Sequence, residues 1–186
     1  MLFRSGIISI KPPAACDLVP QDNVIAGNVL LYGATSGELY VNGQVGERFA
    51  IRNSGASTVI EGAGDHCCEY MTGGRVVCLG EVGVNFGAGM SAGIAYILDS
   101  KGDFDLKCNL EMIDLEPVVE AADKTELKQL IENHYNYTGS PKAKEILANW
   151  QEYLPKFVKV FPTEYRRVLG QMMKEDAEVK REVINN

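Results

Sequence analysis

The sequence contains no apolar run that approaches the ~20 residues needed by a membrane-spanning helix. It has no excess of basic charge either, because 18 Lys and Arg stand against 25 Asp and Glu, for a net charge of −7. Such a chain is a poor partner for nucleic acid or for an anionic membrane surface. The start, MLFRSGIISI, also lacks the basic, apolar and small-residue segments of a signal peptide. We therefore expect a cytoplasmic protein with no nucleic-acid or membrane partner.

Cysteine is scarce, and its spacing forms no CxxC pair. The five cysteines are Cys16, Cys67, Cys68, Cys78 and Cys108. An odd number without such pairs favours free, buried thiols over disulfides or a metal site.

Glycine, in contrast, recurs at a regular spacing through the middle of the chain. Four glycines are 18, 19 and 19 residues apart, and each is followed nine residues later by another. In chain order the eight are Gly37, Gly46, Gly55, Gly64, Gly74, Gly83, Gly93 and Gly102. A period near 20 is typical of a solenoid, so we interpret these glycines as structural turn residues at the corners of a repeating coil.

Short runs of β-forming residues lie between these glycines: ELYV, STVI, RVVC and IAYI. Alignment on the glycines places Val41, Val59, Cys78 and Ile97 in one apolar column. The fold class we predict is an all-β solenoid, a parallel β-helix of roughly four coils in which this column is an inward stack. Residues 6–28 are expected to form a further, imperfect coil.

Helical spacing replaces the glycine repeat after residue 116. Leu127, Leu130, Ile131 and Tyr135 lie on one helical face, and Ser140 is an N-cap residue before Pro141. This second helix, KAKEILANWQEYL, is expected to end at Pro155, and another is expected to begin at Thr163. The apolar faces need a partner, because isolated helices of this length are marginal in water.

The chain is therefore divided into a parallel β-helix at 1–116 and a helical C-terminal extension at 117–186. We expect the helices to pack on the solenoid or on another domain.

Several motifs imitate functional sites without fitting them. GAGMSA, residues 87–92, matches a dinucleotide fingerprint, but that fingerprint requires a following helix and IAYIL is a strand of the repeat. Asp65–Glu69 is rich in metal-ligand residue types, but adjacent strand residues point to opposite faces.

The remaining polar candidates have simple structural interpretations. His66 aligns with Glu47 and Asn85, which favours a hydrogen-bond ladder over a catalytic base. His134 is expected to be a capping or surface residue, and Arg166 with Arg167 a solvated face. We place no catalytic, cofactor-binding or metal-binding residue, and the residues by themselves indicate a non-catalytic scaffold.

Two long blocks resemble a known family. GNVLLYGATSGELYVNGQVGERFAIRNSGA and VIEGAGDHCCEYMTGGRVVCLGEVGVNFGAGMSAGIAYILD resemble the C-terminal GXGXG domain of the glutamate synthase large chain of bacterial type. The tail HYNYTGSPKAKEILANWQEYLPKFVKVFPTEYRRVL is similar to the end of the same chain. The resemblance covers about residues 6–170, although Cys67, Val84 and Ala92 depart from the family pattern.

The resemblance implies a right-handed parallel β-helix that serves as a structural domain. The parent enzyme is an oxidoreductase of nitrogen assimilation, which makes glutamate from glutamine and 2-oxoglutarate with FMN and an iron–sulfur cluster. Those cofactors belong to other domains, so this segment alone is expected to be inactive and to hold none. The implied partners are the amidotransferase and synthase domains of the same chain and the small (beta) subunit.

Two alternatives remain open at this point. One is a GXGXG scaffold subunit of another redox complex, such as the subunit of formylmethanofuran dehydrogenase that shares this solenoid. The other is a secreted solenoid that binds ice or polysaccharide, which would require a signal peptide, long Thr ladders or an acidic cleft. The tail favours glutamate synthase over the first alternative, and none of the features that the second requires is seen in the sequence.

Overall fold

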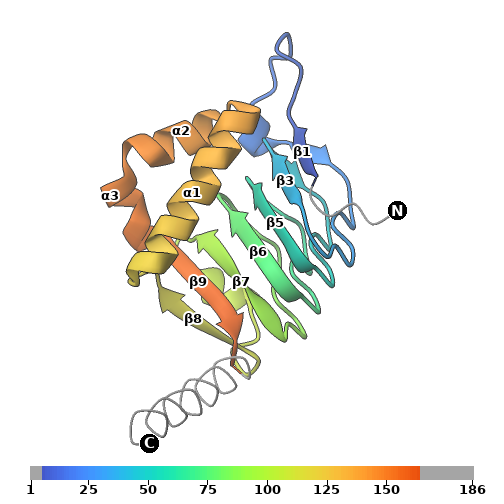
Figure 1. Cartoon of the computed structure of the whole chain (residues 1–186), viewed down its shortest axis with the longest axis vertical. Coiled ribbons are helices and arrows are strands. Elements are labelled where there is room, and N and C mark those ends of the chain that lie inside the picture. The colour runs from blue at the N-terminus through green and yellow to red at the C-terminus, as the bar shows by residue number, and fades with distance from the viewer. Residues whose placement is uncertain (1–5, 164–186) are drawn as a thin grey trace, which may run out of the picture.

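The computed structural model describes residues 6–163, and it shows a solenoid of about four turns flanked by helices (Figure 1). One side of the solenoid is a sheet of five parallel strands in chain order. These strands are β1 (Ile7–Ile10), β3 (Glu38–Val41), β5 (Ser54–Ile60), β6 (Thr72–Cys78) and β7 (Ala92–Leu98). The four short runs of the sequence are therefore confirmed as strands, and the parallel β-helix is confirmed as the fold.

Two further sides complete each coil. On the second side, β2 (Val24–Ala26) pairs in parallel with β4 (Gln44–Val45), and single bridges join Val45 to Ala63 and Ala63 to Val82. The third side has no regular strand, but its backbone is hydrogen-bonded from coil to coil. The first coil is imperfect, as expected, because residues 11–23 leave it in a loop that contains a 3-10 turn (Pro20–Asp22).

The predicted inward stack is correct at three of its four positions. Cys78 pairs with Ile60 on one side and with Ile97 on the other, and Val41 lies in the same interior core. Val59 instead pairs with Tyr40 and faces outward. The prediction was wrong there because the corner after β5 is one residue shorter than the corners of the adjacent coils, so alignment on Gly64 displaced the strand by one position.

The predicted glycine columns are displaced by one residue in the same coil. Gly37, Gly74 and Gly93 share one column at positive φ, whereas Ala56 occupies the equivalent position in the coil of Gly55. In the second predicted column, the N–H groups of Gly46, Gly64 and Gly83 each bond to the coil before. Gly102 does not share this pattern, because its N–H bonds locally to Asp99 and a Cβ added to it would meet nothing within 4 Å.

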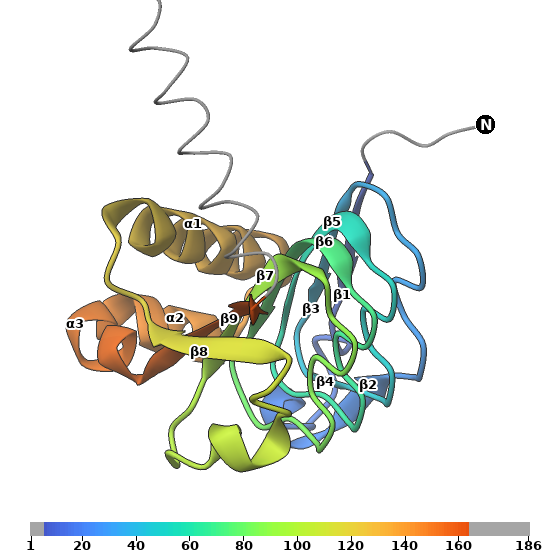
Figure 2. The same cartoon turned by 90° about the horizontal axis from the view of Figure 1, so that it is seen from below.

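Residues 121–156 form the helical layer. They comprise α1 (Ala121–Thr138), α2 (Pro141–Ala148), α3 (Trp150–Tyr153) and a 3-10 turn (Leu154–Lys156). Figure 2 shows α1 and α2 beside the outer face of the parallel sheet. The predicted second helix is thus confirmed to begin at Pro141, but Asn149 interrupts it.

The sheet separates two apolar cores. Inward side chains such as Val41, Ile60 and Cys78 fill the solenoid, while outward side chains pack against α1 and α2. The outward set includes Tyr40, Val59, Val77 and Tyr96. This arrangement confirms that the helices pack on the solenoid.

Two antiparallel strands extend the sheet at its C-terminal end. β9 (Phe157–Pro162) pairs with β7, and β8 (Ile113–Pro117) pairs with β9. A 3-10 turn (Phe104–Lys107) covers the third side of the last coil, where Phe86 N–H donates to the Lys107 carbonyl. Because β9 belongs to the predicted helical extension, residues from both predicted parts share one sheet. Arg166, Arg167 and the helix expected from Thr163 onward lie beyond or at the end of the described residues.

Candidate functional site

The most enclosed polar cluster lies where the helical layer meets the solenoid. Its centre is the Glu61 carboxylate, on the shortened corner after β5, with 1% of its side chain exposed. Ser140 donates its hydroxyl to Glu61 Oε1, and His134 Nε2 lies 3.2 Å from the same oxygen. Both side chains come from the helical layer, so the cluster joins two elements about 75 residues apart in the sequence.

Helix geometry brings His134 and Ser140 to this carboxylate. His134 lies on the face of α1 that also carries the buried Leu127, Leu130 and Ile131, and it is fully buried itself. The expectation that it caps a helix or lies on the surface was wrong. His134 follows Leu130 and Ile131 by four and three residues, so it lies on the same buried face of the helix. Ser140 is the N-cap of α2, as predicted, and accepts the Ala143 N–H at 3.0 Å.

This cluster does not have the order of a nucleophile–base–orienter set. Ser140 donates to the carboxylate instead of to His134, and its oxygen is already the cap of a helix. Catalysis by such residues needs the hydroxyl hydrogen-bonded to the base, and the base in turn held by the carboxylate. Glu61, His134 and Ser140 therefore form a structural junction in which one carboxylate contacts both other side chains, while the buried His134 Nδ1 has no hydrogen-bond partner.

A second polar network holds α1 on the outer face of the sheet. Arg75 on β6 bonds both oxygens of Glu126 at 2.8 and 2.9 Å, and Tyr96 donates to Glu126 at 2.8 Å. Lys159 on β9 pairs with Asp123 at 2.6 Å. Burial raises the pKa of Tyr96, with a further contribution from Glu126, so its hydroxyl stays a donor. Asp123 and Glu126 of α1 are thus matched by two basic residues of the sheet.

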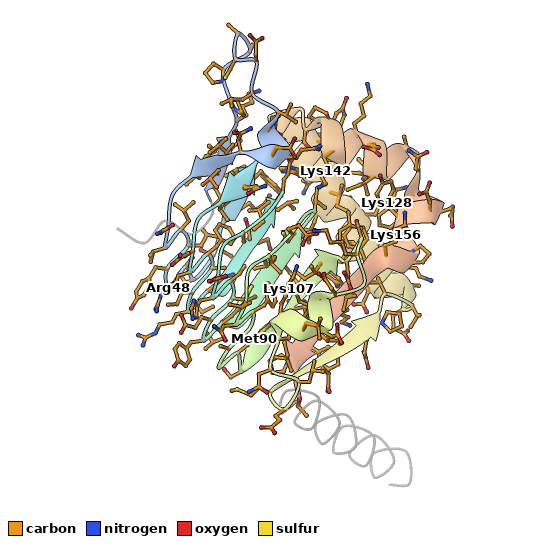
Figure 3. The ribbon with its side chains drawn as sticks, turned by 180° about the vertical axis from the view of Figure 1, so that it is seen from behind. Arg48, Met90, Lys107, Lys128, Lys142 and Lys156 are labelled. Atoms are coloured by element: carbon orange, nitrogen blue, oxygen red, sulfur yellow. The ribbon has the colours of Figure 1, made fainter. Side chains whose placement is uncertain are left out.

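Lysine side chains also lie around the corners of the solenoid (Figure 3). Lys107 pairs with Glu81 at 2.7 Å and with Asp103 at 3.5 Å. Lys142, at the start of α2, reaches the corner at Gly80, where a Cβ would lie 3.3 Å from its Nζ. The ion pairs of Lys107 hold neighbouring segments together at the surface.

The third side of the solenoid has an unusual backbone that sequence reasoning missed. Positive φ recurs at every second residue, and in each coil the N–H groups bond to the coil before or after it. Nine non-glycine residues adopt it: Val29, Leu31, Arg48, Ala50, Arg52, His66, Cys68, Tyr70 and Asn85. Each costs on the order of 1–2 kcal/mol, which the coil-to-coil hydrogen bonds offset.

This backbone explains the buried thiols. Cys67 and Cys68 are adjacent, yet both are buried with their sulfurs 3.8 Å apart. The expectation that neighbours must face opposite sides was wrong, because it assumed strand geometry. The expectation of buried free thiols is confirmed for Cys67, Cys68 and Cys78, and burial raises the pKa of Cys78 to about 12.

His66 also lies on this side. It falls in a column with Arg48 and Asn85, and its Nε2 lies 3.3 Å from Asn85 Nδ2. The predicted ladder is therefore present between His66 and Asn85. Glu47 belongs to the adjacent column with Asp65, so that part of the prediction was wrong.

The side chains of the described residues gather no set of metal ligands. Within residues 6–163, no group of three or more His, Cys, Asp or Glu side chains could hold an ion. The cysteines are spread over several coils, and each of the five is a free thiol. GAGMSA leads into strand β7 and not into a helix, so it offers no helix N-terminus to a pyrophosphate.

No helix among the described residues is long and apolar enough to cross a membrane.

Comparison with known proteins gives one consistent result. The model of the family described as "GXGXG motif" matches residues 2–163. The chain is 52% identical over 179 residues to the NADH glutamate synthase of Schizosaccharomyces pombe, which covers 96% of this chain and 8% of that protein. It is 56% identical over 160 residues to ferredoxin-dependent glutamate synthase 2 of Synechocystis, covering 86% of this chain and 10% of the relative.

The NADPH glutamate synthase large chain of Bacillus subtilis is 51% identical over 177 residues, covering 94% of this chain and 12% of the relative. The chain therefore spans about a tenth of the length of the curated relatives it matches.

Proposed function

This chain belongs to the GXGXG motif family, and from that premise we propose that it is a structural domain of a glutamate synthase large chain. The observation that carries the proposal is the match of almost the whole chain, at about half identity, to one segment of each relative. The parent enzyme would make glutamate from glutamine and 2-oxoglutarate, in the cytoplasm. This segment would hold other parts of that enzyme in position.

Two properties support a structural role. The most enclosed polar groups of the described residues, Glu61, His134 and Ser140, are used to join the helical layer to the solenoid. The three relatives are named for three electron donors, NADH, ferredoxin and NADPH, yet each matches the segment at 51–56% identity. Because the identity is nearly the same whichever electron donor the relative is named for, the segment is best explained by a role that all three enzymes share.

The partners we propose are the amidotransferase and synthase domains of the same polypeptide, and the small subunit in enzymes that have one. The FMN and the iron–sulfur cluster of the parent enzyme would be held by those other parts.

The first test uses the isolated chain. We expect it to release no ammonia from glutamine above a boiled control, to form no glutamate from ammonia and 2-oxoglutarate, and to bind no FMN by absorbance. A yellow protein, or measurable ammonia release, would contradict the proposal.

The second test uses a chimera. The matching segment of the Bacillus subtilis large chain is deleted in one variant and replaced by this chain in another. We expect the deletion to abolish glutamate formation and the replacement to restore it. A matched control carries the replacement with Glu61→Lys, which buries an unpaired ammonium in the junction and should not restore activity. Full activity of the deletion variant would contradict a structural role.

A further inference from the structure

Two cysteines that are adjacent in the sequence meet inside the solenoid. The Sγ atoms of Cys67 and Cys68 lie 3.8 Å apart, in a hydrogen bond that either thiol can donate. Both residues are buried, with no more than 1% of either exposed. Cys78 belongs to the same core, but its thiol donates to the Gly80 carbonyl at 3.3 Å. The contact between Cys67 and Cys68 is therefore a contact between two reactive sulfurs, with the next thiol of the core engaged elsewhere.

The backbone of the third side, on which Arg48 is labelled in Figure 3, holds this pair in place. Cys68 has a φ of +61°, which turns its side chain into the interior beside that of Cys67. The peptide unit between the two cysteines is bonded to both adjacent coils. The Cys68 N–H donates to the Phe49 carbonyl at 2.9 Å, and the Cys67 carbonyl accepts the Gly87 N–H at 2.8 Å. Any reaction between the two sulfurs therefore starts from a fixed backbone.

The two sulfurs are close enough to be joined by side-chain rotation. A disulfide bond is about 2.05 Å long, so the rotation has to close a gap of less than about 2 Å. Consecutive Cα atoms are only about 3.8 Å apart across a trans peptide, below the range of about 4.4–6.8 Å usual for disulfides. A disulfide between neighbours is consequently strained and easily reduced. The pair is thus better suited to reversible oxidation than to a permanent cross-link.

Burial controls the rate of this chemistry. The hydrogen bond with Cys68, together with burial, raises the pKa of Cys67, so little of it is present as the reactive thiolate. A small neutral oxidant such as hydrogen peroxide has to reach the pair through a local opening of the core. We therefore expect a slow reaction whose product is decided by the contact between the sulfurs.

We propose that Cys67 and Cys68 form a reversible modification site, at which a peroxide oxidises one thiol and the other converts it to a disulfide. In the first step one sulfur attacks hydrogen peroxide, the O–O bond breaks, and a sulfenic acid and one water form. In the second step the neighbouring thiol attacks the sulfenic sulfur, the S–O bond breaks, and a second water leaves with the thiol proton. The cysteines lose two electrons and two protons in all, and the peroxide becomes two molecules of water.

The neighbouring thiol also protects the first one. A sulfenic acid without a thiol beside it is open to further oxidation to sulfinic and sulfonic acids, which are not reversed by thiols. Formation of the disulfide stops the oxidation at a stage that glutathione can reverse. The inference goes beyond the proposed function and does not rest on it.

The test treats the native 186-residue chain with hydrogen peroxide, removes the peroxide, alkylates the remaining thiols in denaturant and maps tryptic peptides by mass. Cleavage after Arg52 and Arg75 gives peptide 53–75, in which Cys67 and Cys68 are the two cysteines. We expect this peptide to lose two hydrogen atoms and both alkylation sites, and to recover them after treatment with reduced glutathione. Its oxidation should be about tenfold or more slower than that of Cys16, which lies in the loop of the first coil.

Two variants test the role of the neighbouring thiol. Cys68→Ser keeps a side chain of similar size, but Cys67 should then accumulate as sulfinic or sulfonic acid that glutathione does not reverse. Cys78→Ser is the matched control, because it removes another buried thiol of the same core. It should leave the rate of disulfide formation within about twofold of the original. Circular dichroism checks that each variant is folded, and the map of the unmodified chain identifies the product without any substitution.

Three results would overturn the proposal. One is a disulfide that joins peptide 53–75 to peptide 76–101, because the partner would then be Cys78. Another is sulfinic acid as the main product in the unmodified chain. The third is recovery of both thiols of peptide 53–75 unchanged after Cys16 and Cys108 are fully oxidised.

Discussion

At the scale of single residues, the buried carboxylate of Glu61 is expected to contribute strongly to stability. Replacement by alanine removes the acceptor of the Ser140 hydroxyl and the partner of His134, both of which are fully buried. We expect Glu61→Ala to lower the free energy of unfolding by about 3 kcal/mol, measured by urea denaturation.

The control for this prediction is Glu81→Gln. Glu81 also bonds to lysines, at 2.7 and 3.2 Å, but half of its side chain is exposed. Its replacement should cost about 0.5 kcal/mol. Equal losses for the two variants would show that the enclosure of Glu61 contributes nothing.

Glycine at residue 74 is required by both conformation and space. Its φ is +83°, and a Cβ would collide with the backbone carbonyl of Ala56 in the preceding coil. We expect Gly74→Ala to cost about 3 kcal/mol or more in thermal or urea unfolding. Gly102 separates the two causes, because its φ of +71° is similar but its Cβ would meet open space. Gly102→Ala should cost only about 1 kcal/mol, and a larger loss there than at residue 74 would refute the explanation.

The thiols differ in accessibility. Burial raises the pKa of Cys78 to about 12, and that of Cys108 to about 12 with a contribution from Asp105, so neither forms appreciable thiolate near pH 8. Cys67 and Cys68 are buried in the same core, whereas Cys16 lies in the loop of the first coil. We expect a disulfide reagent to modify one thiol rapidly in the native chain and five in denaturant. Cys16→Ser should remove the rapid phase, and its persistence would show that the core opens.

At the scale of elements, β9 closes the last coil. Val160 is fully buried, with Ala95 of β7 and Leu115 of β8 as its register partners. Val160→Ala should destabilise the chain by about 2 kcal/mol in urea denaturation, because it leaves a cavity between the interior core and the closing strands. Val119→Ala, at an exposed valine of the same chain, should change stability by less than about 0.5 kcal/mol. A small effect at residue 160 would mean that β9 is only loosely attached.

Much of this architecture could be predicted from the sequence, because the same short pattern of glycines and β-forming residues recurs in each coil. Each recurrence strengthens an assignment that one short run could not support alone. The strands containing Leu39, Val76 and Ile97 and the N-cap at Ser140 were each recognisable from their pattern. The strand β9 was not, since Val158 and Val160 follow a helix and pair with residues 61 and 65 positions earlier. The residues FVKVFP could be read as a strand, but nothing in them indicates which strand they pair with. Their antiparallel pairing with the last parallel strand depends on the tertiary fold.

The candidate site was harder to predict for a similar reason. Glu61 is buried because it continues the outward alternation of Val59, at a position that is also buried in the adjacent coils. The sequence alignment missed this because the shortened corner displaced that coil by one residue. His134 could have been found, because its spacing from Ile131 and Leu130 continues an apolar helical face. The positive φ of Cys68 had no recognisable sequence signal, since most of the residues on that side are not glycine.

At the scale of the whole molecule, the sheet is the common wall of two cores. Its inner face packs within the solenoid, and its outer face packs against α1 and α2. A substitution in the outward column, such as at Val77, is therefore in contact with the helical layer as well as with the adjacent coils. The solenoid and the helices are expected to unfold in one cooperative transition.

The shortened corner at Glu61 has a consequence for how such a chain can change over evolutionary time. A deletion inside β5 would exchange its inward and outward side chains, whereas a deletion at the corner leaves every strand in phase. The corner therefore tolerates a change of length that the strands do not. Here the shortened corner carries Glu61, so the place where the repeat changes length is also the place where a later part of the chain is attached.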